Sequence, residues 1–217
     1  MKTHIIKIEV WSDVVCPFCY MGKRKLENAF EELSLKDNVN VEWKSFLLDP
    51  TVPEKFDSPI NVYEYLANRK EITLEESKDM HSYVVEQAAK LGLTYNFDKA
   101  IVANTIDSHR LLHYAKENNL QNELKEKLLY SYFTDGKNLG DKNVLINLGV
   151  EIGLDAKELE EIVRSDKFKN DVYSDIKEAQ EIGVRGVPFF VFNRKYAISG
   201  AQDHKYFIDT LKKVLEE

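Results

Sequence analysis

The chain of 217 residues has two cysteines, Cys16 and Cys19, and they stand three positions apart. They follow an apolar and β-branched run from Ile5 to Val10, which is typical of a buried strand. From Pro17 onward apolar residues recur at helical spacing, and a proline in the first helical turn costs little because its missing N–H has no partner there. The sequence therefore predicts that the Cys-Pro-Phe-Cys motif lies where a strand passes into a helix.

That position determines the chemistry we expect of the two thiols. Unpaired N–H groups and the positive end of the helix dipole favour the thiolate, which is the nucleophilic form of cysteine. We therefore expect Cys16 to be accessible at the helix start, to attack, and to have a pKa below the free value of about 8.5. Cys19 comes one turn later and is expected to face inward and to resolve the mixed disulfide. Asp13 adds a negative charge that opposes the thiolate.

A zinc site is a weaker interpretation of the same motif. Structural zinc needs four ligands, and the chain has no second cysteine pair. The histidine pair at helical spacing, His109 and His113, lies far along the chain. We expect no metal. Two inert buried cysteines are the other alternative, and the adjacent Pro17 and the position at the helix start count against it.

The pattern of elements predicts an α/β fold with an inserted helical block. Residues 39–47 alternate like a half-buried strand, so residues 5–47 read as β-α-β with a parallel pair. Pro50, Pro53 and Pro59 mark a boundary, after which helices dominate. Thr73 has the form of a capping box, and Asp98 is expected to open a further helix. The predicted parts are residues 1–60, a helical insertion over 61–180, and residues 181–217.

The last part returns to strand. Pro188 to Phe192 is an apolar run, a turn follows at Asn193, and residues 196–198 form the second strand of a hairpin before a closing helix that starts at Asp203. A proline that opens a strand can be an ordinary edge residue or a cis proline, and its position alone does not decide between them.

The chain resembles the thioredoxin superfamily and, within it, the DsbA family, above all the FrnE-like cytoplasmic branch related to 2-hydroxychromene-2-carboxylate isomerases. The resemblance is carried by four stretches: Ser12–Gly22 around the cysteines, Asn104-Thr105 with His109-Arg110-Leu111, Tyr132–Gly136, and Gly183–Val191 with Ser199–Gln202. It implies a thioredoxin fold with a large all-helical insertion domain. It also implies that Pro188 is cis and packs against the cysteine pair.

The resemblance also implies roles for the neighbours of the cysteines. Pro17, Phe18, Val187 and Pro188 would contact the substrate, and the backbone of Val187 would pair with an extended segment of it. The family often has tryptophan or histidine where this chain has Phe18. Because phenylalanine cannot donate a hydrogen bond to the Cys16 thiolate, we expect a weaker oxidant than a histidine-bearing relative.

Three residues farther along the chain are candidates for a cleft beside the redox pair. The resemblance places Asn104 and His109 on a helix that faces it, and Arg185 on its rim, where it would steer an acidic partner. The alternative for His109 and Arg110 is a surface helix laced with salt bridges.

The expected function is thiol–disulfide exchange with protein or small-molecule thiols through Cys16 and Cys19. The alternative is a glutathione-dependent isomerase or transferase of the kappa-type branch, whose members use a serine in place of the cysteine pair; a third class is a non-enzymatic holdase. We expect no bound cofactor, with glutathione as a candidate redox partner.

Charge and hydropathy exclude other classes of partner. The 30 basic residues are outnumbered by 37 acidic ones, for a net charge of -7, so we expect no nucleic-acid partner. The cluster Lys23-Arg24-Lys25 is interpreted as a solvated helix face. No window reaches the roughly 18–20 apolar residues of a membrane span, and the N-terminus lacks the form of a signal peptide, so we expect a cytoplasmic protein without a membrane partner.

Overall fold

The computed structural model describes residues 5–216, so the first four residues, on which the expectation of no signal peptide partly rests, lie outside the described residues. The chain divides into two compact units. One is formed by the residues up to Leu48 together with those from Lys169 onward, and the other by Asp49–Phe168. The insertion thus begins and ends about twelve residues earlier than residues 61–180, the range predicted from the sequence.

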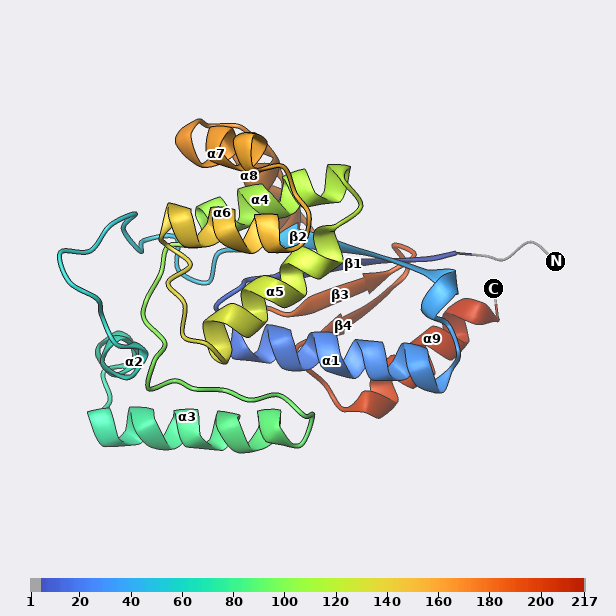
Figure 1. The fold of residues 1–217 in the computed structure, drawn as a ribbon. Helices are drawn as coiled ribbons and strands as arrows, with labels where there is room; N and C mark the ends of the chain where they lie inside the picture. Colours follow the sequence, from blue (N-terminus) through green and yellow to red (C-terminus); the bar gives the residue numbers. More distant parts are fainter. Residues whose placement is uncertain (1–4, 217) are drawn as a thin grey trace. The chain divides into compact units, whose positions relative to one another are not determined.

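The first unit has the predicted thioredoxin fold (Figure 1). Its elements in chain order are β1 (Ile6–Ser12), α1 (Pro17–Glu32), a short 3-10 helix (Lys36–Asn38), β2 (Val39–Ser45), α8 (Lys169–Glu181), β3 (Phe189–Phe192), β4 (Tyr196–Ser199) and α9 (His204–Leu215). The sheet has the order β2-β1-β3-β4. β1 and β2 are parallel, as the β-α-β pattern predicts, and the other two pairs are antiparallel.

Successive side chains along each strand point to opposite faces of the sheet, and each face has its own apolar cluster. On one face, Ile8 and Val10 of β1 and Phe190 of β3 pack with Phe30 of α1 and Phe207 of α9. Phe190 and Phe207 meet edge to face, with ring centroids 5.0 Å apart. Figure 1 shows α1 and α9 on this side of the sheet. This core fixes α1, and with it the start of the helix that carries the cysteines.

The opposite face is covered by α8. Trp11 of β1 packs with Ala179 of α8 and Val191 of β3, and its indole N–H donates to the carbonyl of Asp175 at 2.9 Å. Because α8 packs on this sheet, it belongs to the thioredoxin unit. That is the physical reason why the second boundary lies at Lys169 and not at residue 181.

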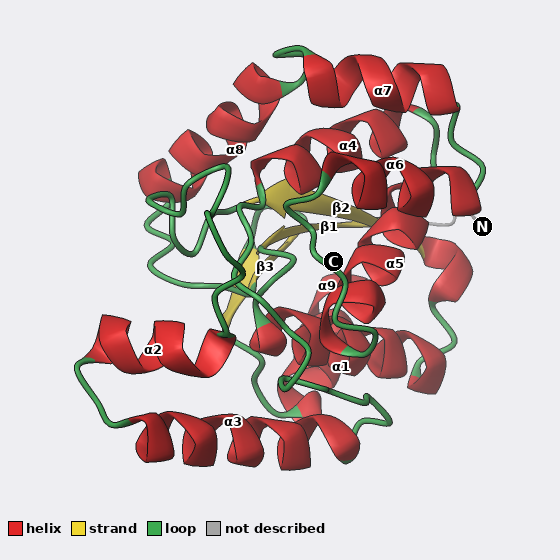
Figure 2. Ribbon diagram, turned by 60° about the vertical axis from the view of Figure 1, so that its left-hand side comes forward, coloured by secondary structure: helices red, strands yellow, loops and turns green. Residues whose placement is uncertain are grey.

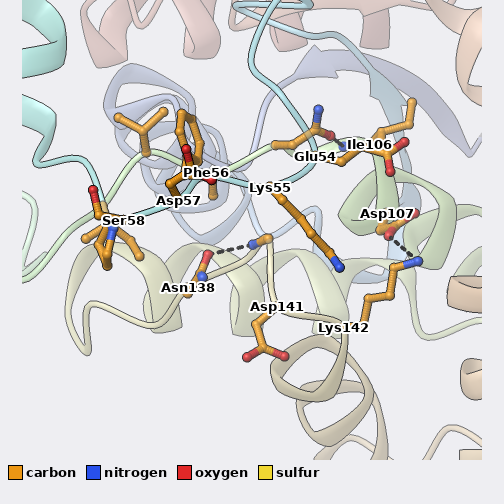
Figure 3. Close-up of a pocket in the computed structure, with 16 residues that line it drawn as sticks. Glu54, Lys55, Phe56, Asp57, Ser58, Ile106, Asp107, Asn138, Asp141 and Lys142 are labelled. Carbon is orange, nitrogen blue, oxygen red and sulfur yellow. Dashed lines mark hydrogen bonds and ion pairs between the residues drawn. The ribbon is translucent and has the colours of Figure 1, made fainter.

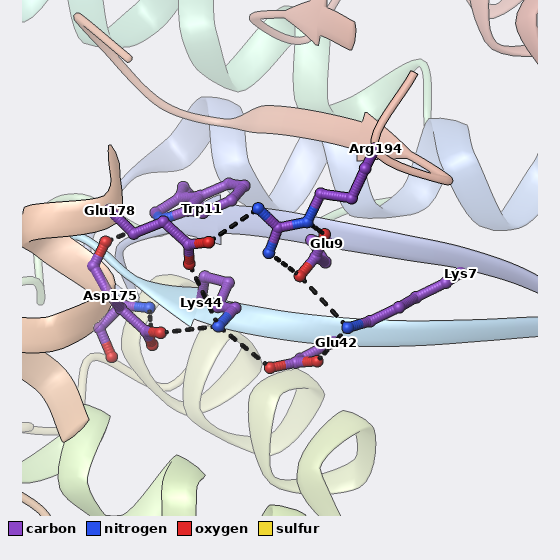
Figure 4. A network of polar contacts seen from close by, with 9 residues as sticks. Lys7, Glu9, Trp11, Glu42, Lys44, Asp175, Glu178 and Arg194 are labelled. Atoms are coloured by element: carbon purple, nitrogen blue, oxygen red, sulfur yellow. Dashed lines mark hydrogen bonds and ion pairs between the residues drawn. The ribbon is translucent and has the colours of Figure 1, made fainter. Parts of the chain in front are cut away.

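A network of charges extends along this face beyond the apolar cluster (Figure 4). Asp175 of α8 lies 3.0 Å from the ammonium of Lys44 and accepts from the backbone N–H of Ser45 at 2.9 Å. The buried Glu9 pairs with Arg194 of the β3–β4 turn and, at 3.3 Å, with Lys7. Burial alone would lower the pKa of Lys44, but the carboxylates of Asp175 and Glu42 raise it above its ordinary value. The network therefore ties α8 and the hairpin turn to β1 and β2.

The second unit is helical, as predicted (Figure 2). Its helices are α2 (Val62–Lys70), α3 (Leu74–Ala89), α4 (Ile106–Glu117), α5 (Gln121–Phe133), α6 (Lys142–Glu151) and α7 (Ala156–Arg164). Thr73 and Glu76 form the predicted capping box, and Asp141 and Asp155 cap the helices that follow them. Within residues 5–216, no helix is both long enough and apolar enough to cross a membrane.

Two sequence expectations about this unit are wrong. Asp98 does not open a helix: α4 begins at Ile106, because the preceding segment pairs with the chain before α2, where the Val102 N–H donates to Ile60 O at 2.9 Å. Arg110 is not a surface residue. It is 4% exposed, and its guanidinium donates to Asp107 and to the carbonyls of Ile162, Ser165 and Lys167 at the end of α7.

The stability of the helical unit is expected to fall in mild acid. His81 of α3 lies edge-on between Tyr63 and Phe97, and its Nδ1 is 2.7 Å from Ser77 O. Burial lowers the pKa of His81, although the bond to Ser77 opposes this. Because the pKa of His81 is lower in the folded protein than in the unfolded chain, this residue contributes stability above the unfolded pKa of about 6.5. That contribution is lost as the pH falls through the pKa of His81 in the folded protein.

Thermal unfolding between pH 7.5 and 5 measures this effect. His81→Phe, which keeps a ring between Tyr63 and Phe97, should show a flatter dependence of the unfolding midpoint on pH than the wild type. Parallel curves for the two proteins would contradict the assignment to His81.

Candidate active site

The two cysteines lie where β1 gives way to α1, as predicted. Cys16 is the N-cap of α1, with extended backbone angles, and Pro17 occupies the first helical position. The Cys16 carbonyl accepts from the N–H of Cys19 at 3.0 Å and of Tyr20 at 3.4 Å, so the first turn begins at the motif itself. Both cysteines are free thiols.

The exposure of the motif differs from what the sequence suggests. Cys19 is fully buried, as expected, but Cys16 is also buried, at 3% exposure, and so the expectation of an accessible Cys16 is wrong for this conformation. Phe18 stands between them with 45% of its surface exposed. The motif therefore presents an apolar ring to solvent beside a covered sulfur.

The segment before β3 packs against the motif. The Val187–Pro188 peptide bond is cis. The Cys16 thiol donates to the carbonyl of Val187 at 3.6 Å. Pro188 is buried, and a Cβ added at Gly22 would lie 2.9 Å from its ring. The glycine thus lets α1 approach Pro188 closely, a role that sequence reasoning missed although Gly22 belongs to the stretch around the cysteines.

The pKa of the Cys16 thiol differs from what the sequence predicts. Burial raises the pKa of the Cys16 thiol well above its usual value, and the neighbouring Cys19 and the carboxylate of Asp13 raise it further. The expectation of a lowered pKa is therefore wrong, because it considered the helix N-terminus without the burial of the sulfur. In the reduced protein the thiol form of Cys16 is favoured.

Asp13 is itself held in place. It is 1% exposed, and its Oδ2 accepts from the backbone N–H of Leu48 at 2.9 Å. Its carbonyl accepts from the Cys16 N–H at 3.3 Å. The sequence indicated the charge of Asp13 but gave no signal for Leu48, whose contribution is a backbone N–H.

The other candidate residues differ in their exposure. Arg185 is exposed, three residues before Pro188. His109 is 1% exposed in α4. Lys23 is 2% exposed and pairs with Glu27 at 2.5 Å, so the first residue of the basic cluster is not solvated as expected. Among residues 5–216, no group of three or more histidine, cysteine or acidic side chains is arranged to hold a metal ion.

Asn104 lines a cavity of about 600 Å³ inside the helical unit (Figure 3). Its side chain donates to Val52 O at 2.6 Å and accepts from the Ile106 N–H at 3.0 Å. Lys55 and Lys142 also line this cavity, and a carboxylate oxygen of Asp107 lies 3.9 Å from the ammonium of Lys142. The two hydrogen bonds of Asn104 hold the loop that leads into α4, so the position of Asn104 is explained without a ligand.

Comparison with known proteins agrees with this fold. The chain matches the DsbA-like thioredoxin domain family over residues 7–212. A probable DsbA oxidoreductase from Streptomyces coelicolor superposes with a TM-score of 0.91 at 34% identity, covering 98% of this chain and 91% of that one. The uncharacterized protein YwbO of Bacillus subtilis is 30% identical over 190 residues, 86% of each chain.

A more distant structure shares the fold alone. The cytosolic disulfide reductase DsbM from Pseudomonas aeruginosa has a TM-score of 0.67 at 14% identity, covering 97% of this chain and 98% of that one. A thioredoxin sheet, a Cys-x-x-Cys motif at a helix start and a proline loop against it define the class of thiol–disulfide oxidoreductases. The chain belongs to the DsbA-like thioredoxin domain family within that class.

Proposed function

We propose that the protein exchanges disulfides with protein or small-molecule thiols through Cys16 and Cys19. The observation that carries the proposal is the placement of Cys16 at the first turn of α1, with its sulfur against the Val187 carbonyl and Cys19 one turn behind it. Phe18 and the backbone of Val187 are proposed to contact the substrate, together with Pro17 and Pro188.

In the reducing direction, Cys16 loses its proton to solvent and attacks one sulfur of a substrate disulfide. The substrate S–S bond breaks, its other sulfur leaves as a thiolate and takes up a proton, and Cys16 is joined to the substrate. Cys19, deprotonated in turn, attacks Cys16 Sγ and releases the second substrate thiolate. The substrate gains two electrons and the protein becomes the Cys16–Cys19 disulfide. An external thiol of the glutathione class is proposed to restore the dithiol.

We propose that reduction is the preferred direction. Strong oxidants of this class are strong because their reduced form is stabilised, through a thiolate of low pKa. Here burial, Cys19 and Asp13 raise the pKa of Cys16, so that stabilisation is missing. The structural likeness to a cytosolic disulfide reductase is compatible with this direction, and with a cytoplasmic location in which such a reductase would act.

Reduction of insulin disulfides in the presence of dithiothreitol tests the activity. The wild-type protein should accelerate precipitation of the insulin B chain over dithiothreitol alone. Equilibration with mixtures of reduced and oxidised glutathione then gives the reduction potential, which we expect near that of a cytosolic thiol pool, about -220 to -320 mV. A protein that does not accelerate insulin reduction contradicts the activity, and a potential above about -150 mV contradicts the direction.

A further inference from the structure

The charges on the α8 face of the sheet close into a ring (Figure 4). Cations and carboxylates alternate around it, and each member forms an ion pair with both of its neighbours: Lys7, Glu9, Arg194, Glu178, Lys44 and Glu42. Asp175 joins the ring from outside, through Lys44. Glu178 is the member that α8 contributes, so the ring attaches this helix to the strands and to the hairpin turn.

Glu178 bridges two segments that lie far apart in the chain. One oxygen of its carboxylate lies 2.7 Å from the guanidinium of Arg194 in the β3–β4 turn, and the other lies 3.4 Å from the ammonium of Lys44 on β2. Three of the 13 residues of α8 are buried, and one of these is Asp175. Because the apolar contact of α8 is small, its charged contacts contribute much of what holds it on the sheet.

The end of α8 is fixed close to Glu178. The carbonyl of Glu178 accepts from the Ile182 N–H at 3.0 Å, and the carbonyl of Ala179 accepts from the Val184 N–H at 2.8 Å. The side chain of Val184 is buried in the same apolar cluster as Trp11. The chain therefore leaves the helix from a defined point, and the position of that point follows the position of α8.

A short link connects this point to the redox site. Residues 185 and 186 alone separate Val184 from Val187, whose carbonyl accepts from the Cys16 thiol at 3.6 Å. On the other side of Val187, the carbonyl of Pro188 accepts from the Gly200 N–H at 2.8 Å. Because two residues span at most about 7 Å, the link leaves little slack, and a shift of α8 displaces the Val187 carbonyl from the sulfur.

We propose that Glu178 is a positioning residue for the exchange reaction: its ion pairs with Arg194 and Lys44 fix the end of α8 and so hold the Val187 carbonyl against the Cys16 sulfur. This rests on the proposed function, in which Cys16 attacks and the backbone of Val187 contacts the substrate. A carbonyl that accepts from the thiol favours the protonated sulfur, whereas the thiolate is the attacking form. Glu178 thereby restrains the reduced Cys16 from a distance.

The ring offers a variant and a matched control. Glu178→Gln removes the charge and keeps the size of the side chain. Glu181→Gln is the control, because Glu181 lies on the same helix, is 62% exposed and pairs with Lys177 of that helix at 3.6 Å. Arg194 is left unchanged because it also pairs with the buried Glu9, which would otherwise lose a cation.

The experiment is the rate of alkylation of reduced protein by iodoacetamide at neutral pH, in a Cys19→Ser parent so that one thiol is measured. The Cys16 thiol loses its proton to the buffer, the thiolate attacks the methylene carbon, the C–I bond breaks and iodide leaves. No turnover is needed, so failure of this test is distinguishable from failure of the proposed function.

Glu178→Gln should raise the alkylation rate about two- to threefold over the parent. Loss of one hydrogen bond that favours the protonated sulfur gives about fivefold more thiolate, and the lower nucleophilicity of a less basic thiolate offsets part of this gain. Glu181→Gln should alkylate at the rate of the parent.

Salt supplies a second readout, which a general loss of stability would not reproduce. The side chains of Glu178 and Arg194 are 29% and 47% exposed, so salt at about 1 M, where the screening length is about 3 Å, should weaken their ion pair. The rate of the parent should therefore rise with salt toward that of Glu178→Gln, whose own rate should change little. Iodoacetamide is uncharged, so salt does not act on its approach to the thiolate.

An alkylation rate that is unchanged in Glu178→Gln overturns the proposal, and so does an equal rise in Glu181→Gln, which would indicate an effect of net charge. An equal salt dependence in Glu178→Gln and the parent also overturns it, because the ion pair would then not be what holds the loop. If Glu178→Gln does not fold, as judged by circular dichroism, Glu178→Asp, which is one methylene shorter and weakens both ion pairs, takes its place in both measurements.

Discussion

Cys16→Ser is expected to abolish disulfide turnover, and Cys19→Ser is expected to trap the reaction halfway. Serine at position 16 removes the attacking sulfur at the start of α1, so insulin reduction should fall to the rate of dithiothreitol alone. Serine at position 19 leaves Cys16 able to attack but removes the group that releases the substrate, so a mixed disulfide should accumulate. Mass spectrometry after challenge with oxidised glutathione measures the adduct, one glutathione per chain on Cys16.

The two variants control for each other. Their substitutions are the same in size and lie one turn apart in the same helix, so a loss of fold would affect both in a similar way, and circular dichroism would show it. An adduct that forms on Cys19 of Cys16→Ser but not on Cys16 of Cys19→Ser would reverse the assigned roles. This test is needed because burial does not distinguish the two cysteines: Cys19 is fully buried and Cys16 is nearly so.

The sequence predicts the thioredoxin unit well because its signals are local. The apolar run before Cys16, the helical spacing after Pro17 and the turn at Asn193 each reflect residues that lie close together in the chain. The parallel pairing of β1 with β2 follows from the length of the connection between them, which needs a crossover. The family resemblance adds that this unit has the thioredoxin fold and that Pro188 is cis and packs against the cysteine pair.

The predictions that are wrong depend on contacts between segments that lie far apart in the sequence. The role of α8 in the sheet unit depends on the contacts of Asp175 with Lys44 and Ser45, which are 131 and 130 residues earlier in the chain. The periodicity of the sequence gives no sign of these contacts. Arg110 has the composition of a surface helix, yet it binds carbonyls more than fifty residues away. The pKa of Cys16 was misjudged for the same reason, because burial of a side chain depends on what folds over it.

Asp175→Ala is expected to be the most destabilising of the substitutions considered for the sheet unit. The carboxylate is nearly buried and makes two contacts that alanine cannot replace: the ion pair with Lys44 at 3.0 Å and the bond from the Ser45 N–H at 2.9 Å. Loss of the second leaves a buried donor at the end of β2 without its acceptor, which costs about 1–3 kcal/mol. Breaking a buried ion pair can cost about 3–5 kcal/mol.

Lys44 keeps Glu42 at 3.2 Å and Glu178 at 3.4 Å, so the ion-pair loss should be only partial and the total should be about 2–4 kcal/mol. Urea unfolding followed by circular dichroism measures the change. Asp175→Asn, which retains an acceptor for the Ser45 N–H, should lose less than Asp175→Ala, and Asp209→Ala, an exposed aspartate of α9, should change stability by at most about 0.5 kcal/mol. Equal losses in Asp175→Asn and Asp175→Ala would place the whole effect in the ion pair with Lys44. A loss in Asp175→Ala no larger than in Asp209→Ala would show that α8 is held to the sheet by Trp11 and its apolar neighbours alone.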